Sequence, residues 1–264
     1  MPAIDCHAHV FAASAPMVPD ARYRPSHDAT LADWRGLWPE AGVTHGVLVQ
    51  PSFFGTDNSA LLAAMAAAPD ILRGVAVVGP DATEAELGRL SAAGVRAVRL
   101  NLQGIADLSM YAGAPWQALF ERLHALGMHV EVLADPGHLP SLLPAFLHAK
   151  IAIVLDHFGN PGADDAQVDA TFAAIDRLKT RGEVHAKLSG WYRLRRGEPG
   201  ALARRLLATL GSGQLVWGSD WPWTRHEGRH TYRDCRTALD DWVPREHLGA
   251  ILWDNPARLY GFSR

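Results

Sequence analysis

Short runs of apolar residues alternate with longer, Ala- and Leu-rich amphipathic stretches along most of the chain. Apolar runs of this kind are typical of strands that are buried on both faces. The pattern predicts eight strands, which are Ala3–His7, His45–Gln50, Leu72–Val78, Val95–Asn101, His129–Leu133, Ile151–His157, Val184–Ser189 and Leu215–Asp220.

The stretches between these strands carry helix signals. Asp57–Ala68 opens with capping residues, and Thr83–Ala93 opens with a capping-box pattern in which Glu86 follows three residues after Thr83. Pro115–Leu126 begins with a proline suited to a first turn and ends at Gly127. Further helices are predicted at 138–148, 164–181, 199–210, 231–242 and 255–260.

The segment between the first two predicted strands departs from this alternation. It contains Pro16, Pro19 and Pro25, followed by Trp34 and Trp38. We expect a long irregular loop here, and a loop of that length inside a compact domain is often functional.

Strict alternation of strands and helices predicts a parallel sheet of the α/β class. Closed on itself, this sheet is a (β/α)8 TIM barrel, which typically needs about 250 residues. The alternative is an open doubly wound sheet, which usually has a Gly-rich loop after its first strand. Here His-Ala-His-Val-Phe follows the first strand, so we predict one barrel domain spanning residues 1–264.

Composition limits the classes of partner. The chain has 25 basic and 28 acidic residues and a net charge of −3, so nothing attracts it generally to nucleic acid or to an anionic membrane. Its two cysteines cannot form a disulfide scaffold, and we recognise neither a signal peptide nor an apolar run of membrane-spanning length. We expect a cytoplasmic protein with a small-molecule substrate, as a monomer or small homo-oligomer.

Three motifs fall where a barrel places its active site, at the C-terminal ends of the strands. His7 and His9 are two apart, so both face one side of their strand. Asp220 ends the last predicted strand, which neighbours the first when the barrel closes. His157 follows an apolar strand that ends in Asp-His. We interpret Asp220 as a general base for water, and the histidines as oxyanion-stabilising donors or metal ligands.

These motifs carry a family resemblance. Asp5–Phe11, Asp156–Gly159 and Trp217–Pro222 resemble the amidohydrolase superfamily, more narrowly its "amidohydrolase 2" branch, and the likeness extends from position 4 to about 260. Within the branch, the chain is most similar to the 2-pyrone-4,6-dicarboxylate hydrolase-like lactonases. The segments that carry this narrower likeness are Val49–Ser52, Gly55–Asn58, Gly94–Asn101 and Ser189–Arg193.

The resemblance implies substrate contacts through Ser52, Arg99 and Arg193. An arginine at the active-site end of a strand is suited to bidentate recognition of a carboxylate, although any single arginine can instead form a surface ion pair. We place six residues at the substrate site, with the tryptophans as apolar walls: Ser52, Asn58, Arg99, Arg193, Trp191 and Trp221.

The need for a metal is left open by the motifs. Metal-dependent members of the family add a histidine after the fifth strand, whereas here His129 stands at the start of that strand and Glu131, in its middle, needs a buried partner. His7, His9, His157 and Asp220 still suffice in number for a divalent ion such as zinc. The pyrone dicarboxylate hydrolases, which share this pattern, are the metal-independent exception, so we expect no required cofactor.

The resulting hypothesis is a lactonase that opens a small anionic or sugar lactone by water attack. The run after Asn101 lacks the basic pair typical of the pyrone dicarboxylate group, Asn160 stands where that group has an arginine, and Leu133 where it has a tyrosine. A substrate with less charge than a dicarboxylate is therefore predicted. The alternatives are a metal-dependent decarboxylase of an unsaturated or aromatic acid and a non-catalytic binding barrel.

Overall fold

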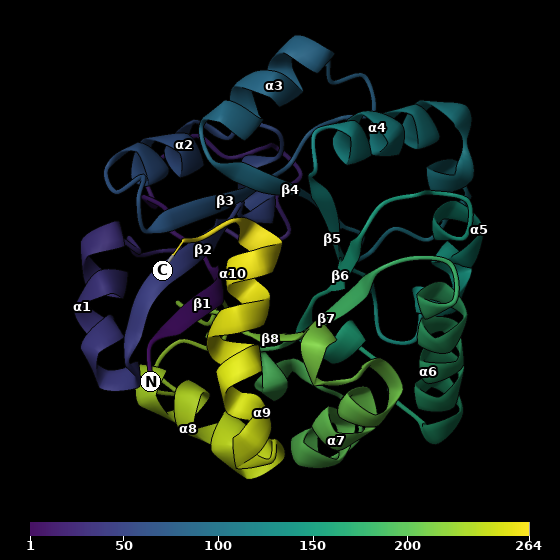
Figure 1. Cartoon of the computed structure of the whole chain (residues 1–264). Helices are drawn as coiled ribbons and strands as arrows, with labels where there is room; N and C mark the ends of the chain where they lie inside the picture. The colour runs from purple at the N-terminus through teal and green to yellow at the C-terminus, as the bar shows by residue number, and fades with distance from the viewer. Residues whose placement is uncertain (264) are drawn as a thin grey trace.

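Eight parallel strands follow one another around the centre of the molecule in chain order (Figure 1). The computed structural model describes residues 1–263. The strands are β1 (Ala3–Ala8), β2 (Val43–Val49), β3 (Leu72–Ala76), β4 (Val95–Asn101), β5 (His129–Leu133), β6 (Ile153–Leu155), β7 (Val184–Leu188) and β8 (Leu215–Trp217).

The two ends of the sheet meet just beyond β8. The backbone N–H of Asp220 donates to the carbonyl of His7 at 2.8 Å, and the N–H of His9 donates to the carbonyl of Trp221 at 2.8 Å. Ala8 and Trp221 form a parallel bridge. The sheet is therefore a (β/α)8 barrel, as predicted, and the alternative of an open doubly wound sheet is wrong.

The helices form a ring outside the barrel (Figure 1). Among residues 1–263, every helix is too short or too polar to cross a membrane. Only α10 runs over the end of the barrel where the strands begin, connected to α9 through a π-helical turn at Ala250–Asp254. The helices are α1 (Leu31–Ala41), α2 (Ser59–Ala66), α3 (Glu84–Ala92), α4 (Ala114–Ala125), α5 (Leu143–Phe146), α6 (Asp165–Lys179), α7 (Pro199–Leu210), α8 (Tyr232–Trp242), α9 (Arg245–Gly249) and α10 (Asn255–Tyr260).

Helix α1 corrects the prediction of one long irregular loop between the first two strands. A capping box begins it, in which Thr30 Oγ1 accepts from the Asp33 N–H and Asp33 Oδ2 accepts from the Thr30 N–H. Trp34 and Trp38 pack on the barrel. The three prolines all precede the capping box, so only the first half of the segment is irregular.

Several predicted strands end earlier than their apolar runs suggest, and in two of them this moves site residues out of the strand. β6 stops at Leu155 and β8 at Trp217, so Asp156, His157 and Asp220 lie beyond the ladders. Their backbones turn sharply there, since His157 and Asp220 have φ values of 49° and 57°. Non-glycine residues rarely adopt this left-handed conformation, which costs about 1–3 kcal/mol each and is typical of functional sites.

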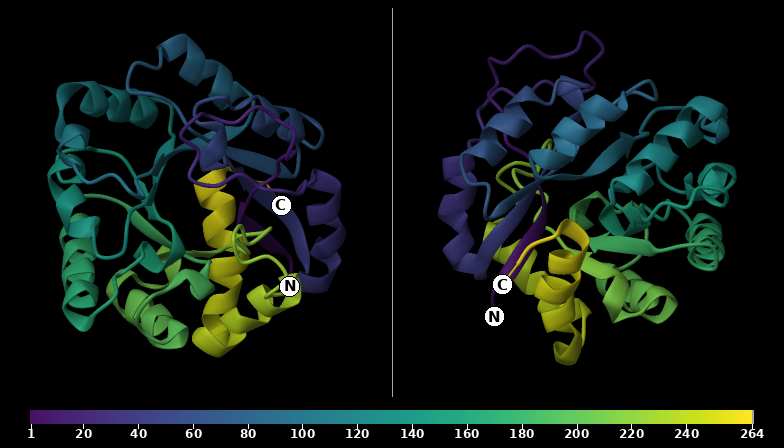
Figure 2. Two further views of the ribbon diagram at one scale, coloured as in Figure 1. Left: turned by 180° about the vertical axis from the view of Figure 1, so that it is seen from behind. Right: turned by 45° about the horizontal axis from the view of Figure 1, so that its top comes forward.

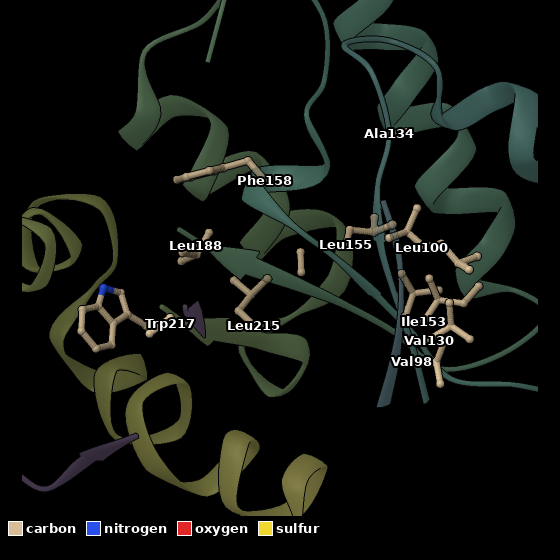
Figure 3. Packing of buried hydrophobic residues seen from close by; sticks show 14 of the residues in the cluster. Val98, Leu100, Val130, Ala134, Ile153, Leu155, Phe158, Leu188, Leu215 and Trp217 are labelled. Carbon is tan, nitrogen blue, oxygen red and sulfur yellow. The ribbon is translucent and has the colours of Figure 1, made fainter. Parts of the chain in front are cut away.

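The apolar core lies in two layers. The larger layer fills the space between strands and helices, where Val98, Val130 and Ile153 stand side by side in register on β4, β5 and β6 (Figure 3). The smaller layer fills the lower barrel, near the ends where the strands begin. It comprises Ile4, Cys6, Val47, Val49, Val75, Ala97, Val216, Trp253, Tyr260 and Phe262.

A buried carboxylate joins the two sides of the barrel seam. Asp5 on β1 accepts from the N–H and the hydroxyl of Ser219 at 2.8 and 2.6 Å, beyond β8. It also accepts from the Trp34 indole of α1 at 3.1 Å and the Tyr232 hydroxyl of α8 at 2.7 Å. In a regular strand Asp5 and His7, which are two residues apart, would face the same side, but here Asp5 faces the helices. The β1–β2 pairing is irregular between Asp5 and Ala8, which breaks the alternation.

We expect the Asp5 carboxylate to contribute to stability through its donors. Tyr232→Phe removes one donor with little change in packing, so the free energy of unfolding should fall by about 1–2 kcal/mol. Asp5→Asn should lower it further, by about 2–4 kcal/mol, because an amide N–H then faces other donors. Urea unfolding followed by tryptophan fluorescence measures both variants. Equal losses in the two would contradict the central position of the carboxylate.

Candidate active site

A cavity of about 270 Å³ opens at the C-terminal ends of the strands. Figure 2 (left) views the molecule from this side, opposite to α10, with the purple segment after β1 and the yellow-green segment after β8 toward the viewer. Six residues that the sequence placed in the site line the cavity: His9, Ser52, Arg99, His157, Arg193 and Asp220.

Asp220 is the centre of this arrangement. Its Oδ1 lies 3.7 Å from the Nε2 atoms of His7 and His9 and 3.9 Å from that of His157. Close approach of the two chain segments is needed here, because a Cβ on Gly218 would lie 2.7 Å from the Cβ of His7. The barrel seam therefore brings together residues that are more than two hundred positions apart.

The other oxygen of Asp220 is fully engaged. Its Oδ2 accepts from the Tyr192 hydroxyl at 2.6 Å and from Arg193 Nε at 2.7 Å. Burial raises the pKa of Asp220, but nearby positive charge, above all that of Arg193, outweighs burial and holds that pKa well below its usual range. Asp220 is thus ionised at neutral pH, with Oδ1 left to face the imidazoles.

His9 has a defined tautomer. Its Nδ1 lies 2.7 Å from the carbonyl of Val49, which can only accept, so Nδ1 carries the proton and Nε2 has a free lone pair. Burial, together with the charges of His7 and Arg99, lowers the pKa of His9 well below its usual value. His9 is therefore neutral and presents an acceptor to Asp220.

His157 packs closely against the end of β7. Its Nδ1 lies 2.9 Å from the Ser189 hydroxyl. A Cβ on Gly190 would come within 2.6 Å of that Nδ1, so only glycine leaves room for the ring. Burial lowers the pKa of His157 to about 3, and the ring is neutral. Since the Ser189 hydroxyl can donate or accept, both tautomers of His157 are accessible.

His7 lies deepest, above a network of buried charges inside the barrel. Lys187 Nζ is 3.2 Å from His7 Nδ1, 2.5 Å from Glu131 Oε2 and 3.3 Å from Asp156 Oδ1. Burial alone would lower the pKa of Lys187, but Glu131 and Asp156 raise it above its usual value. Arg99 Nε donates to Asp156 Oδ2 at 3.0 Å.

This network includes residues to which the sequence assigned no role. Glu131 has the buried partner that its position required, and Tyr260 of α10 also donates to it at 2.6 Å. Lys187 stands within the apolar β7 strand, and a lysine there signals a buried acidic partner. Tyr192 is the other omission, because a tyrosine in a surface loop gives no sequence signal of its partner.

His7 lies beneath the cavity without lining it, and three predicted substrate contacts also lie outside the lining as the structure describes it. Asn58 exchanges hydrogen bonds with the Val77 backbone and also donates to the Thr56 carbonyl. Trp191 packs on His230 and Trp242. The Trp221 ring is buried in the outer core. The structure thus places these three side chains outside the lining of the cavity, and their contact with substrate stays a prediction.

The cavity is strongly cationic. Three of its arginines lie in loops to which the sequence assigned no role: Arg22 after β1, Arg195 after β7 and Arg225 after β8. Arg22 donates to Gln103 Oε1 and Asn101 Oδ1, both at 3.1 Å. With Arg99 and Arg193 there are five arginines against the carboxylates of Asp135 and Asp220. An anion is therefore the ligand that this lining favours.

Two groups of side chains are spaced as metal ligands are. Ligand atoms of His7, His157 and Asp220 lie within 4.8 Å of one another, and so do those of His7, Glu131 and Asp156. Imidazole and carboxylate are the donors that zinc prefers. Both groups therefore have the spacing and the donor types of a candidate metal position.

Comparison with known proteins agrees with the motifs. Residues 4–262 match the amidohydrolase family. The chain is 31% identical to a 2-pyrone-4,6-dicarboxylate hydrolase of Comamonas testosteroni, over 98% of this chain and 90% of that protein. It is also 31% identical to a 4-sulfomuconolactone hydrolase of Rhizobium radiobacter, over 97% of this chain and 89% of that one.

Solved structures show the same relationship. A probable 2-pyrone-4,6-dicarboxylic acid hydrolase from Acinetobacter baumannii, with citric acid bound, superposes with a TM-score of 0.90 at 35% identity, covering 99% of this chain and 100% of that one. A 5-carboxyvanillate decarboxylase from Sphingomonas paucimobilis shares only the fold, at 14% identity and a TM-score of 0.73, with 99% of each chain covered. The chain belongs to the amidohydrolase family and, within it, is related to lactone hydrolases.

Proposed function

We propose that this protein hydrolyses a small lactone that carries an acidic group, with Asp220 as the general base and without a required metal. One observation carries the proposal: Asp220 keeps a single free oxygen, which faces three imidazoles at the base of an arginine-lined cavity. The related proteins named as lactone hydrolases support the reaction type.

The attacking water binds between two acceptors. Asp220 Oδ1 and His9 Nε2 are 3.7 Å apart, and neither carries a proton. A water that donates one hydrogen to each keeps its lone pair free for the lactone carbonyl. As the oxygen–carbon bond forms, Asp220 takes the proton. This assigns His9 to the water, whereas the sequence suggested that it polarises the carbonyl.

The carbonyl oxygen accepts from the other two rings. With the Ser189 hydroxyl donating to Nδ1, His157 carries its proton on Nε2 and points a donor into the cavity. His7 is fully buried behind it, and its Nε2 has no hydrogen-bond partner among residues 1–263. An oxyanion that reaches both nitrogens is stabilised by two donors. Asp220 then returns its proton to the ring oxygen as that bond breaks.

The arginines select an anionic substrate. Arg99 binds Asp156 through Nε, which leaves its terminal nitrogens for a ligand. Arg22 supplies positive charge next to Asn101 from a different segment of the chain, where the sequence lacks the basic pair. The expectation of a less charged substrate depended in part on that local run, so we favour an anionic lactone over a neutral sugar lactone.

A tightly held divalent ion does not fit these residues. A histidine that binds zinc through Nε2 needs a lone pair on that atom, and His9 offers one. His7 does not, because the Lys187 ammonium donates to its Nδ1 and leaves the ring proton on its Nε2. The cavity also has more arginines than carboxylates to offset a divalent charge. The decarboxylase alternative depends on a metal, and no feature of the cavity favours it.

Loss of the base should abolish turnover. We expect Asp220→Asn to lower kcat on an anionic lactone by about 1,000-fold, within the range that general-base catalysis contributes. The amide keeps the shape of the side chain, so ligand binding should persist. Single-turnover assays and calorimetric binding of the product measure the two effects. A variant that retains wild-type kcat would show that another group activates the water.

The acid limb of the pH profile should depend on Arg193. This guanidinium is the strongest of the charges that lower the pKa of Asp220, so Arg193→Met raises that pKa. Because Asp220 must be ionised to act, kcat should then fall at a higher pH on the acid side than in the wild type. The pH dependence of kcat measures this shift. An unmoved acid limb would mean that Asp220 is not the titrating base.

Substrate charge should determine the effect of Arg22. We expect Arg22→Met to raise KM about tenfold for an anionic lactone, the loss of roughly one charge-assisted contact, with little effect on a neutral one. Arg204→Met on the exposed face of α7 is the control. Equal effects of Arg22→Met on both substrates would contradict recognition of an anion.

A site without a required metal makes a separate prediction. Activity measured in the presence of a chelator should equal activity measured without it.

A further inference from the structure

We propose that Lys187 is a positioning residue whose ammonium keeps the proton of His7 on Nε2 and takes the place of a metal cation beneath the site. The inference rests on the proposed function, in which His7 donates to the oxyanion. It assigns the buried charges of β5 and β7 a part in the chemistry of the cavity above them.

The ammonium hydrogen-bonds to two of its neighbours, Glu131 and His7, and forms an ion pair with the third, Asp156. Its contacts are Glu131 Oε2 at 2.5 Å, His7 Nδ1 at 3.2 Å and Asp156 Oδ1 at 3.3 Å. All four side chains are completely buried. An ammonium has three donors and no acceptor, so it can only donate to the ring of His7.

That donation decides the tautomer of His7. A neutral imidazole that accepts at Nδ1 carries its hydrogen on Nε2. The opposite tautomer would turn an N–H of the ring toward the ammonium. It would need Asp156 Oδ1, 3.3 Å from Nδ1, as its acceptor, but no hydrogen bond to that oxygen forms among residues 1–263. The arrangement therefore favours a donor at Nε2, on the side of Asp220.

The same ammonium lies where a cation would otherwise bind. Glu131, Asp156 and His7 form one of the two groups with metal-ligand spacing, and Lys187 contacts an atom of each. The positive charges of Lys187 and Arg99 balance those two carboxylates. No negative charge of this network is left to attract a metal ion.

The two carboxylates that contact Lys187 are themselves fixed by other hydrogen bonds. Tyr260 donates to Glu131 at 2.6 Å from below, and Arg99 donates to Asp156 at 3.0 Å from β4. Glu131 lies opposite Arg99 and Val154 in the ladders of β5. Because this network of contacts involves three strands and α10, movement of the ammonium is limited. A fixed ammonium is what positioning of the His7 ring requires.

The direct test is the tautomer of His7 in the wild-type protein. Nitrogen-15 NMR of histidine-labelled protein, with His7 assigned from the spectrum of His7→Gln, distinguishes the two ring nitrogens. We expect a protonated Nε2 and an unprotonated Nδ1 at neutral pH. A protonated Nδ1 with a bare Nε2 would overturn the proposal, whether or not the protein turns over any lactone.

The second test uses a charge-balanced variant, Lys187→Met with Glu131→Gln, because Lys187→Met alone leaves a buried carboxylate unpaired. If Lys187 positions His7, this variant folds, but kcat falls about 100-fold while KM changes little. Zinc added alone binds at least about tenfold tighter in equilibrium dialysis, at the group of His7, His157 and Asp220, whose ligand atoms the variant keeps. Lys179→Met, on exposed α6, is the control and should match the wild type.

Each measurement on the charge-balanced variant has a result that would contradict the proposed role of Lys187. A charge-balanced variant with wild-type kcat would reduce Lys187 to a structural ion pair, and so would unchanged zinc affinity. If this variant does not fold, the wild-type spectrum still decides the tautomer. Failure of the proposed lactonase activity removes only the kcat measurement, because the NMR and zinc experiments need no substrate.

Discussion

The closure of the barrel between β1 and β8 is the constraint on which the rest of the structure depends. Asp5 holds that seam by binding Ser219 across it, together with one side chain from each of two flanking helices. The next residue, Asp220, then lies against His7. The same hydrogen bonds that close the sheet therefore set the distance between the base and the imidazoles.

A second constraint comes from burying charge. A carboxylate or an ammonium inside the barrel is tolerated only with partners that match it in charge and in hydrogen-bonding capacity. Lys187 with Glu131 and Asp156 with Arg99 satisfy this condition beneath the site, and Arg193 satisfies it for Asp220. The protein thus supplies a positive partner for each of these buried carboxylates from its own side chains.

In the proposed reaction, substrate selection belongs to the loops, whereas the reacting groups lie on or next to strands. Arg22, Arg195 and Arg225 come from three different connections. The Tyr23 hydroxyl donates to Glu227 at 2.8 Å and links the segments that carry Arg22 and Arg225. The rigid barrel positions the reaction, and the loops can differ in charge without disturbing it, which is consistent with relatives that act on differently substituted lactones.

The sequence by itself determined the barrel and predicted the four candidate reactive residues that the structure brings together. Hydrophobic periodicity and helix capping predict strands and helices because they depend on residues close together in the chain. The candidate reactive residues stand out as polar groups at the ends of apolar runs: His7, His9, His157 and Asp220. It missed α1, since the prolines before Thr30 obscured the capping box, and it assigned Asn58, Trp191 and Trp221 to a cavity that they do not line.

The tertiary structure decided which way each group faces and what it contacts. Asp5 and His7 point to different sides only because the β1–β2 pairing is irregular, and the partners of Lys187 come from three other elements. The tautomer of His9 depends on a carbonyl forty residues away, and the charge of the cavity on arginines from separate loops. Such contacts join residues distant in the chain, so no local pattern encodes them.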